Sequence, residues 1–551
     1  MNRTRQILKK SAAAVLCASL ILSGSSTAFA AGSYQETEKA ALNKLTDGIP
    51  ETWDTYLENY KKSAAGSKSN MTLKVEDTGR ALIGALMGGT DVSWLQSISL
   101  DSNISIKDGV EAIVSSVLLN DNKLCDFNVY MDLANMMEYI QIPELSDSYM
   151  KAPVSSDSEE NSEEAQQFLN TYMTTLSDLT SVLPDSKTLS TLLDRYGNII
   201  IDSFEEGSSV EESVSVDGIS EECTAYEGII SEKTAYTIVE KVLTTAKDDE
   251  EIKALFDQWS DDASNEENQY KDFQNLITDA LDDMNRDDEG STDNEAFSSK
   301  VWVNGDGKIV GRQFGITDGT DTTPVFTWKE PSEGEDSALL LELAADDSSF
   351  TFTGSGKTAD GLLNGDYILA VNGTETVDIN VENLETKPAK AGYYNGTFNI
   401  SFPAAETGES TEDDTDTSAT DMLAGFGAVI KLTSDADADT STLDLTVTTS
   451  GAALATLSIT GSYGEGVEIP DFASLDKTYD ATDDEAMTEY LTEINWDTFL
   501  ANVKAAGVPD ELATQLEDVL KAAVESASQP AEEENADTET DTDTTAEDDA
   551  A

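Results

Sequence analysis

Apolar and polar residues alternate in several parts of the chain, which is the pattern of a β-strand with one buried face. The first such region covers about 97–142 and the second about 209–231. Turn residues separate the alternating runs, for example Asn120 to Asn122. The alternating positions are Ile98, Leu100, Ile104 and Ile106, then Cys125, Phe127, Val129 and Met131. We expect an antiparallel meander here.

Other parts of the chain have the 3.6-residue period of amphipathic helices. These parts are about 163–204 and about 233–284, and each has a single apolar face. Residues 34–62 also have this period, and Gly48 and Pro50 predict a break in that helix. Helices with only one apolar face must pack on a sheet or on each other.

The remaining segments follow from the same patterns. Residues 296–465 are nearly all strand-like, and about nine strands are predicted. Helices are predicted within 480–526. Residues 527–551 are acidic and lack large apolar side chains, so a disordered tail is predicted. An N-terminal α+β region would then occupy 31–295, and the pattern leaves open whether the two β-rich regions share one sheet.

The fold class predicted from these elements is α+β, with an extensive antiparallel sheet (a meander or half-barrel) and packed amphipathic helices. Residues 97–145, which end in the run Tyr139 to Leu145, resemble the long-stranded meander of extracytoplasmic lipoprotein carriers of the LolA/LppX type. That resemblance implies a curved sheet that holds acyl chains under helices. It covers about a tenth of the chain and assigns no individual residue.

Residues 1–30 have the pattern of a secretory signal peptide. Four basic residues precede an apolar run from Ala12 to Leu22, which is too short to span a bilayer. Ala28 and Ala30 occupy the two positions that a signal peptidase recognises, so Ala31 is the predicted mature N-terminus. We therefore expect a secreted or extracytoplasmic protein of the bacterial envelope exterior, without a transmembrane anchor.

The charge of the chain narrows the classes of partner. There are 108 acidic and 33 basic residues, with a net charge of −75. Nucleic acids are bound by Lys and Arg that replace counterions, so a nucleic-acid partner is excluded. Solubility outside the cell is the favoured explanation of the acidity, ahead of a specific cationic partner.

The chain has no histidine. This removes the usual base near neutral pH and the commonest metal ligand, and with it Ser-His-Asp, Cys-His and HExxH chemistry. No catalytic residue, cofactor or metal site is predicted. Asn304 to Ile309 and the aspartates 435, 437 and 439 lack the remaining ligands of a calcium loop, so both are interpreted as turns.

Two cysteines follow the signal segment, Cys125 and Cys223. A disulfide between them and a pair of free thiols remain equal alternatives, because spacing alone does not place two Cα atoms within bonding range.

These observations favour an exported, non-enzymatic binding protein, with an apolar or lipid-like molecule as the candidate ligand. One alternative is a structural or adhesive cell-surface protein. The other is a carboxylate-dependent glycan hydrolase, which needs only two suitably spaced acids.

Overall fold

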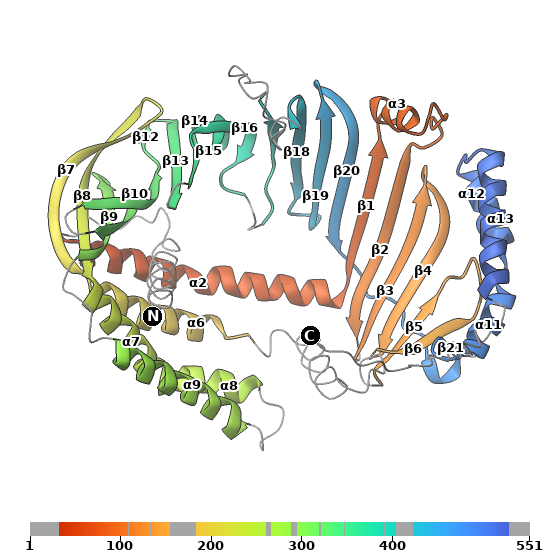
Figure 1. Cartoon of the computed structure of the whole chain (residues 1–551), viewed down its shortest axis with the longest axis horizontal. Coiled ribbons are helices and arrows are strands. Elements are labelled where there is room, and N and C mark those ends of the chain that lie inside the picture. Colours follow the sequence, from red (N-terminus) through yellow and green to blue (C-terminus); the bar gives the residue numbers. More distant parts are fainter. Residues whose placement is uncertain are drawn as a thin grey trace, which may run out of the picture.

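The computed structural model describes residues 32–527 except 108, 133–134, 155–182, 260–265, 288–294, 319–320, 346–347, 389, 391, 404–422 and 476. The signal segment, the predicted helical residues 163–182 and the acidic tail from 528 lie outside the described residues. The fold is α+β, as predicted, and the strands form one large open sheet that is mostly antiparallel (Figure 1).

The helices are α2 (Tyr34–Ala65), α3 (Asp77–Leu86), α6 (Ser186–Ile201), α7 (Glu232–Lys247), α8 (Glu250–Trp259), α9 (Glu266–Asp287), α11 (Asp484–Glu493), α12 (Trp496–Ala505) and α13 (Asp510–Ala527). The strands of the N-terminal half are β1 (Ser67–Val75), β2 (Ser97–Lys107), β3 (Val110–Leu119), β4 (Asn122–Asp132), β5 (Met137–Gln141), β6 (Tyr149–Pro153), β7 (Glu205–Val216) and β8 (Ile219–Ser231). The later strands are β9 (Glu295–Asn304), β10 (Ile309–Asp318), β11 (Asp321–Lys329), β12 (Ser332–Glu333), β13 (Asp336–Ala345), β14 (Ser348–Ala359), β15 (Leu362–Val371), β16 (Thr374–Glu385), β17 (Gly396–Ser401), β18 (Phe426–Asp435), β19 (Thr440–Thr449), β20 (Ala452–Tyr463) and β21 (Thr478–Asp480).

The two β-rich regions of the sequence belong to the same sheet. Starting from β7, successive strands pair in chain order through β8, β9, β10, β11 and β13 up to β20, and the short β12 pairs beside β13. Strand β1 then pairs with β20 on one side and with β2 on the other, and the sheet continues through β6. Strand β1 therefore joins the two regions.

The stretch predicted to hold about nine strands forms twelve, β9 to β20, in its described residues. The difference comes from tight turns that the pattern of apolar residues does not mark. Asp360 and Gly361 between β14 and β15 both have positive φ, as do Asn372 and Gly373 between β15 and β16. This is the conformation of two-residue hairpin turns, for which Asn-Gly and Asp-Gly are the preferred pairs.

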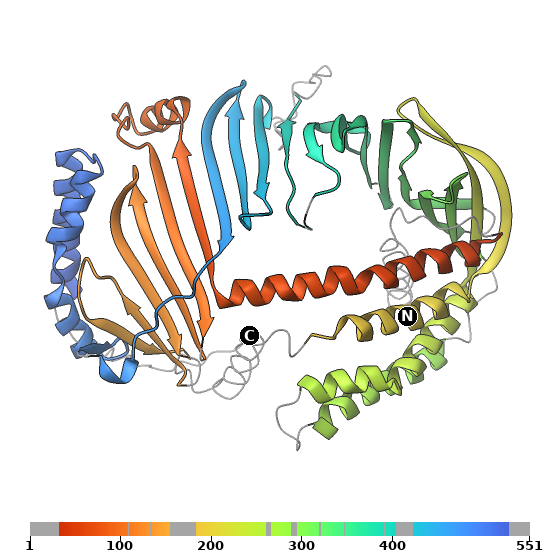
Figure 2. The same cartoon turned by 180° about the vertical axis from the view of Figure 1, so that it is seen from behind.

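Helix α2 runs below the strands from the β7–β8 end of the sheet to the foot of β1 (Figures 1 and 2). The predicted break at residues 48–50 is wrong, because the helix is continuous with Pro50 inside it. A proline leaves the carbonyl four residues earlier without its helical donor. That carbonyl belongs to Thr46, and the Ser190 hydroxyl of α6 donates to it at 3.0 Å. The neighbouring helix thus supplies the missing hydrogen bond.

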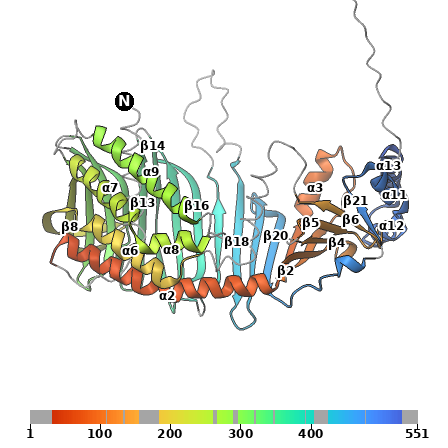
Figure 3. The same ribbon diagram turned by 90° about the horizontal axis from the view of Figure 1, so that it is seen from below.

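The helices α6 to α9 gather at one end of the sheet, and α11 to α13 lie at the other (Figure 3). A cluster of buried side chains from α2, α6, α7 and strands β8 to β11 forms the main core at the first end. Its members include Tyr34, Leu42, Ile201, Phe204, Ile230, Ile238, Val301, Phe314 and Phe326.

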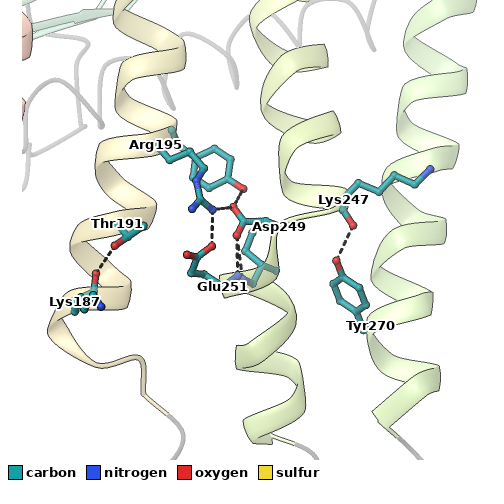
Figure 4. A network of polar contacts seen from close by, with 9 residues as sticks. Lys187, Thr191, Arg195, Lys247, Asp249, Glu251 and Tyr270 are labelled. Carbon is teal, nitrogen blue, oxygen red and sulfur yellow. Dashed lines mark hydrogen bonds and ion pairs between the residues drawn. The ribbon is translucent and has the colours of Figure 1, made fainter.

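Polar contacts join α6 to the junction of α7 and α8 (Figure 4). The buried carboxylate of Asp249 pairs with Arg195 and accepts a 2.7 Å hydrogen bond from the Tyr196 hydroxyl. It also accepts from the backbone N–H of Glu251 at 3.0 Å, which caps the start of α8. Burial alone would raise the pKa of Asp249, but the hydrogen bonds from Arg195 and Tyr196 lower it to about 2.

Replacement of Ser190 by alanine tests the bond to the Thr46 carbonyl. We expect Ser190→Ala to lower the free energy of unfolding by about 1 kcal/mol, the usual contribution of one hydrogen bond. In a Pro50→Ala background, the restored backbone N–H of residue 50 makes Ser190 dispensable, so the loss should be much smaller. Urea unfolding of the four proteins gives the coupling energy, and equal losses in both backgrounds would contradict the assignment.

The Asp249 network predicts a pH dependence of stability. The pKa of this carboxyl is lower in the folded protein than in the unfolded chain, so its contribution is present above about pH 4 and is lost as the pH falls toward about 2. Asp249→Asn keeps an N-cap side chain but removes the charge, and should cost about 2 kcal/mol at pH 7. The difference in unfolding free energy between wild type and variant should shrink below pH 4. Asp47→Asn on the exposed part of α2 is the control for removal of a carboxylate and should change the unfolding free energy at pH 7 by less than about 0.5 kcal/mol.

Candidate functional site

One face of the sheet is apolar across many consecutive strands. In an antiparallel pair, directly opposed residues point to the same face, so the registers trace rows of side chains across the sheet. One row crosses eight strands from β3 to β16, and every member is apolar. Its members are Leu119, Ile98, Leu73, Leu457, Leu445, Ile430, Phe398 and Val381. We call the face that carries this row the apolar face.

The neighbouring row lies on the opposite face and is polar. Its members, from β2 to β16, are Ser99, Thr72, Ser458, Asp444, Lys431, Thr397 and Glu382. We call the face that carries this row the polar face. A shift of one residue thus changes a wholly apolar row into one that carries three charges, and the two faces are clearly distinguished by the sequence.

The apolar face has no charged residue at any register position of the ten strands from β13 to β2. The chain has 141 charged residues among 551, so roughly one position in four would be charged if they were spread evenly. The charges on these strands, such as Asp366, Lys431 and Lys74, lie on the polar face or next to the turns. Burial or contact with an apolar molecule is the usual reason for excluding charge from a surface.

The described helices cover only part of the apolar face. At β8 to β11, the residues of this face belong to the main core beneath α2, α6 and α7. Farther along, the same face stays partly open to solvent. Leu343 on β13 is 46% exposed, Val447 on β19 is 39% exposed, and Met71 on β1 is 45% exposed. Only a few of its members, including Tyr367 and Val381, are buried.

A buried ion pair fixes α2 to the covered end of this face. Glu38 of α2 accepts a hydrogen bond from the Arg312 guanidinium of β10 at 2.5 Å, and both side chains are almost fully buried. Arg312 stands opposite Trp328 on β11, at the end of the apolar row that passes through β15, β14 and β13. Tyr34, one turn before Glu38, is also fully buried, and its pKa is raised well above the usual range by burial and by the Glu38 carboxylate.

The far end of α2 leads directly into β1. The connection is Gly66, where a Cβ atom would come within 2.5 Å of the Gly464 carbonyl oxygen. The Gly464 N–H donates to the Gly66 carbonyl at 2.9 Å. The two glycines allow the helix to end against the irregular segment that follows β20. Strand β1 itself was missed by the sequence analysis, although Met71, Leu73 and Val75 alternate as a strand should.

The two cysteines lie apart in the fold and are both free thiols. Cys125 is on β4 and Cys223 is on β8, near opposite ends of the sheet. Burial raises the pKa of Cys125, and it raises the pKa of Cys223 to about 11. The free-thiol alternative is therefore the one that the structure supports.

The segments interpreted as turns are turns. Residues 304–307 connect β9 to β10, and the Asn304 side chain accepts from the N–H groups of Asp306 and Lys308. Asp435 and Asp439 flank the turn between β18 and β19, and Asp439 pairs with Lys390. In the part of the chain that the structure describes, no three His, Cys, Asp or Glu side chains are placed to share a metal ion.

Two open hollows lie on the surface of the described part of the chain. The larger, about 510 Å³, is lined by residues 143–148 with Glu493, Asn495 and Thr498. Its Glu144 pairs with Lys123 at 2.9 Å, and its Glu493 pairs with Lys477. A second hollow of about 370 Å³ lies over the feet of β1 and β2 and is lined mainly by polar side chains.

Comparisons of the chain with protein-family models, with curated proteins and with solved structures found no match. The resemblance to the LolA/LppX carriers therefore stays a prediction. Among the described helices, none has the length and apolar character needed to cross a membrane.

Loss of one partner of the buried ion pair tests its role in fixing α2. Arg312→Met leaves the Glu38 carboxylate buried without its guanidinium, and should cost about 3 to 5 kcal/mol of unfolding free energy. The double variant Glu38→Leu with Arg312→Met should recover most of that loss. The exposed pair Lys357–Glu335 is the control, since Glu335→Gln should change stability by less than about 1 kcal/mol. A double variant as unstable as Arg312→Met alone would contradict this explanation.

Proposed function

We propose that the protein is an exported, extracytoplasmic binding protein whose ligand is an apolar or lipid-like molecule held on the apolar face. The observation that carries this proposal is the charge-free apolar face of the ten strands from β13 to β2, which the described helices leave partly exposed. Export rests on the signal pattern of residues 1–30.

The energetic argument concerns the exposed apolar area. Monomeric proteins rarely expose contiguous apolar patches above a few hundred Å², and larger ones mark binding surfaces. Strands lie about 4.8 Å apart, so ten strands span on the order of 40 Å. An extended acyl chain can lie along such a stretch, and its burial is favourable by about 25 cal/mol for each Å² of apolar area.

The composition of the face also restricts the chemistry of the ligand. A charged group placed against β13 to β2 would lose its hydration without meeting a counter-charge, which is costly. The part of the ligand in contact with these strands is therefore uncharged. Any polar head group stays near the ends of the strands, where the turns carry hydroxyl and charged side chains.

Neither alternative has a comparable supporting observation. For a glycan hydrolase, two of the carboxylates of the larger hollow, Glu144 and Glu493, are each held by a lysine. For an adhesive protein, the long edge strand β7 is the natural pairing surface, but it carries Glu205, Glu206 and Glu211. Charged residues on an edge strand oppose pairing with another chain. We therefore favour ligand binding.

A pair of neighbouring substitutions on β18 tests the proposal. Ile430 lies on the apolar face and Val429 on the polar face of the same strand. Ile430→Glu should weaken binding of a neutral apolar dye, such as N-phenyl-1-naphthylamine, by about tenfold or more, because it places a charge in the binding surface. Val429→Glu is the matched control and should leave the affinity nearly unchanged. Dye fluorescence in titrations gives both dissociation constants.

Two outcomes would overturn the proposal. One is equal dye affinity for wild type and Ile430→Glu when both proteins are folded by circular dichroism. The other comes from native mass spectrometry of protein purified from its own host, in which we expect an added mass from a bound apolar molecule. Uniformly ligand-free protein, together with no dye binding, would rule out an apolar-ligand carrier.

A further inference from the structure

Helix α3 presents the apolar side chains of Leu82 and Leu86 to solvent and its glycines, Gly79 and Gly84, to the protein. The helix follows β1 and packs against β20 through Gly79, where a Cβ atom would come within 2.1 Å of the Leu454 carbonyl oxygen. Gly84 is also buried. On the outer side, Leu82 is 47% exposed, Leu86 is 80% exposed and Met87, at the C-cap, is 57% exposed. This is the reverse of an ordinary surface helix, whose apolar residues face the core.

The orientation of α3 is fixed by its contacts. Close packing at Gly79 leaves no room for a side chain at this position. The Arg80 guanidinium donates to the Val75 carbonyl and pairs with Asp77, which ties the first turn to the end of β1. Rotation of the helix to bury Leu86 would break both arrangements. The exposed apolar side chains therefore belong to the folded state.

The charge around these side chains is unusual for this chain. Residues 78–90 contain no acidic residue, and Arg80 is the single charged residue among them. Acidic residues make up 108 of the 551 residues of the whole chain, so a segment of this length would ordinarily hold two or three. The tip of α3 is thus an uncharged apolar surface on a protein of net charge −75.

The size of the surface favours a lipid bilayer over a protein partner. A stable protein interface buries roughly 800 Å² on each side, and the outer face of a ten-residue helix is much smaller. Insertion into the boundary between head groups and acyl chains has no such minimum area, because its strength scales with the apolar area that is buried. The net negative charge of the protein disfavours anionic membranes.

We infer that the outer side chains of α3, namely Leu82, Leu86 and Met87, insert into an electrically neutral lipid surface and dock the protein there. The helix lies at the end of β1 and against β20, where Val75 and Ala455 begin the apolar face. Docking at α3 brings that end of the face to the lipid surface. The inference rests on α3 alone and holds whether or not the apolar face binds a ligand.

Vesicle flotation tests this docking. The full chain should float with vesicles of phosphatidylcholine, and replacement of one-third of the lipid by phosphatidylglycerol should reduce the bound fraction, because the rest of the protein is acidic. The double variant Leu86→Ser with Met87→Ser should lower the partition coefficient by tenfold or more. The serines lack the favourable free energy that Leu86 and Met87 gain on moving from water into lipid. Leu276→Ser on α9 is the matched control, because Leu276 is 70% exposed at the other end of the molecule and should not matter.

Three results would overturn the inference. The first is a wild-type protein that floats with neither kind of vesicle. The second is a Leu276→Ser variant that loses as much binding as the α3 variant. The third is a self-association, seen by sedimentation without lipid, that the α3 variant abolishes, because the occupant would then be a second copy of the chain. Thermal melting should show the α3 variant as stable as wild type, since both side chains are exposed.

Discussion

The ion pair between Glu38 and Arg312 is the interaction on which the arrangement of the whole molecule depends. It joins α2 to β10, so that this helix starts from the covered end of the sheet. From there α2 leads directly to β1, and β1 holds β20 and β2 together. A buried pair of this kind is a weak source of net stability, because desolvation offsets most of the attraction. Its contribution is specificity, since other positions of α2 would leave two buried charges unpaired.

The same geometry explains why one face of the sheet can stay open. Helix α2 covers the sheet only near its N-terminus, together with α6 and α7, and then passes along to β1. The remaining strands keep the apolar pattern of a covered sheet without a described helix on it. An apolar surface in water is unfavourable unless something binds there. The exposed side chains of α3 extend this pattern, because they lie at the end of the same face.

Several features of the fold could be predicted from local pattern. The strands within 97–142 and 209–231, the helices of 233–284 and 480–526, and the turn at residues 304–307 all follow from spacing and turn residues. Errors arose where a distant residue compensates for a local signal. Pro50 predicts a helix break, and the hydroxyl of Ser190, which is 140 residues away, removes the reason for it. Strand β1 lies between two helices and only its last five residues alternate, with Met71, Leu73 and Val75 as its apolar members, so its pattern is easily overlooked.

The sequence by itself determined that the strands have one predominantly apolar face, because side chains alternate along a strand whatever the tertiary fold. It also determined the exclusion of histidine chemistry, because the chain has no histidine. Only the tertiary structure decided that these faces join into one surface across ten strands. That depends on pairings such as β1 with β20, whose residues are almost 400 positions apart. It also decided that the apolar residues of α3 point outward, because the close approach of Gly79 to Leu454 is a contact between distant segments that helical periodicity alone does not reveal.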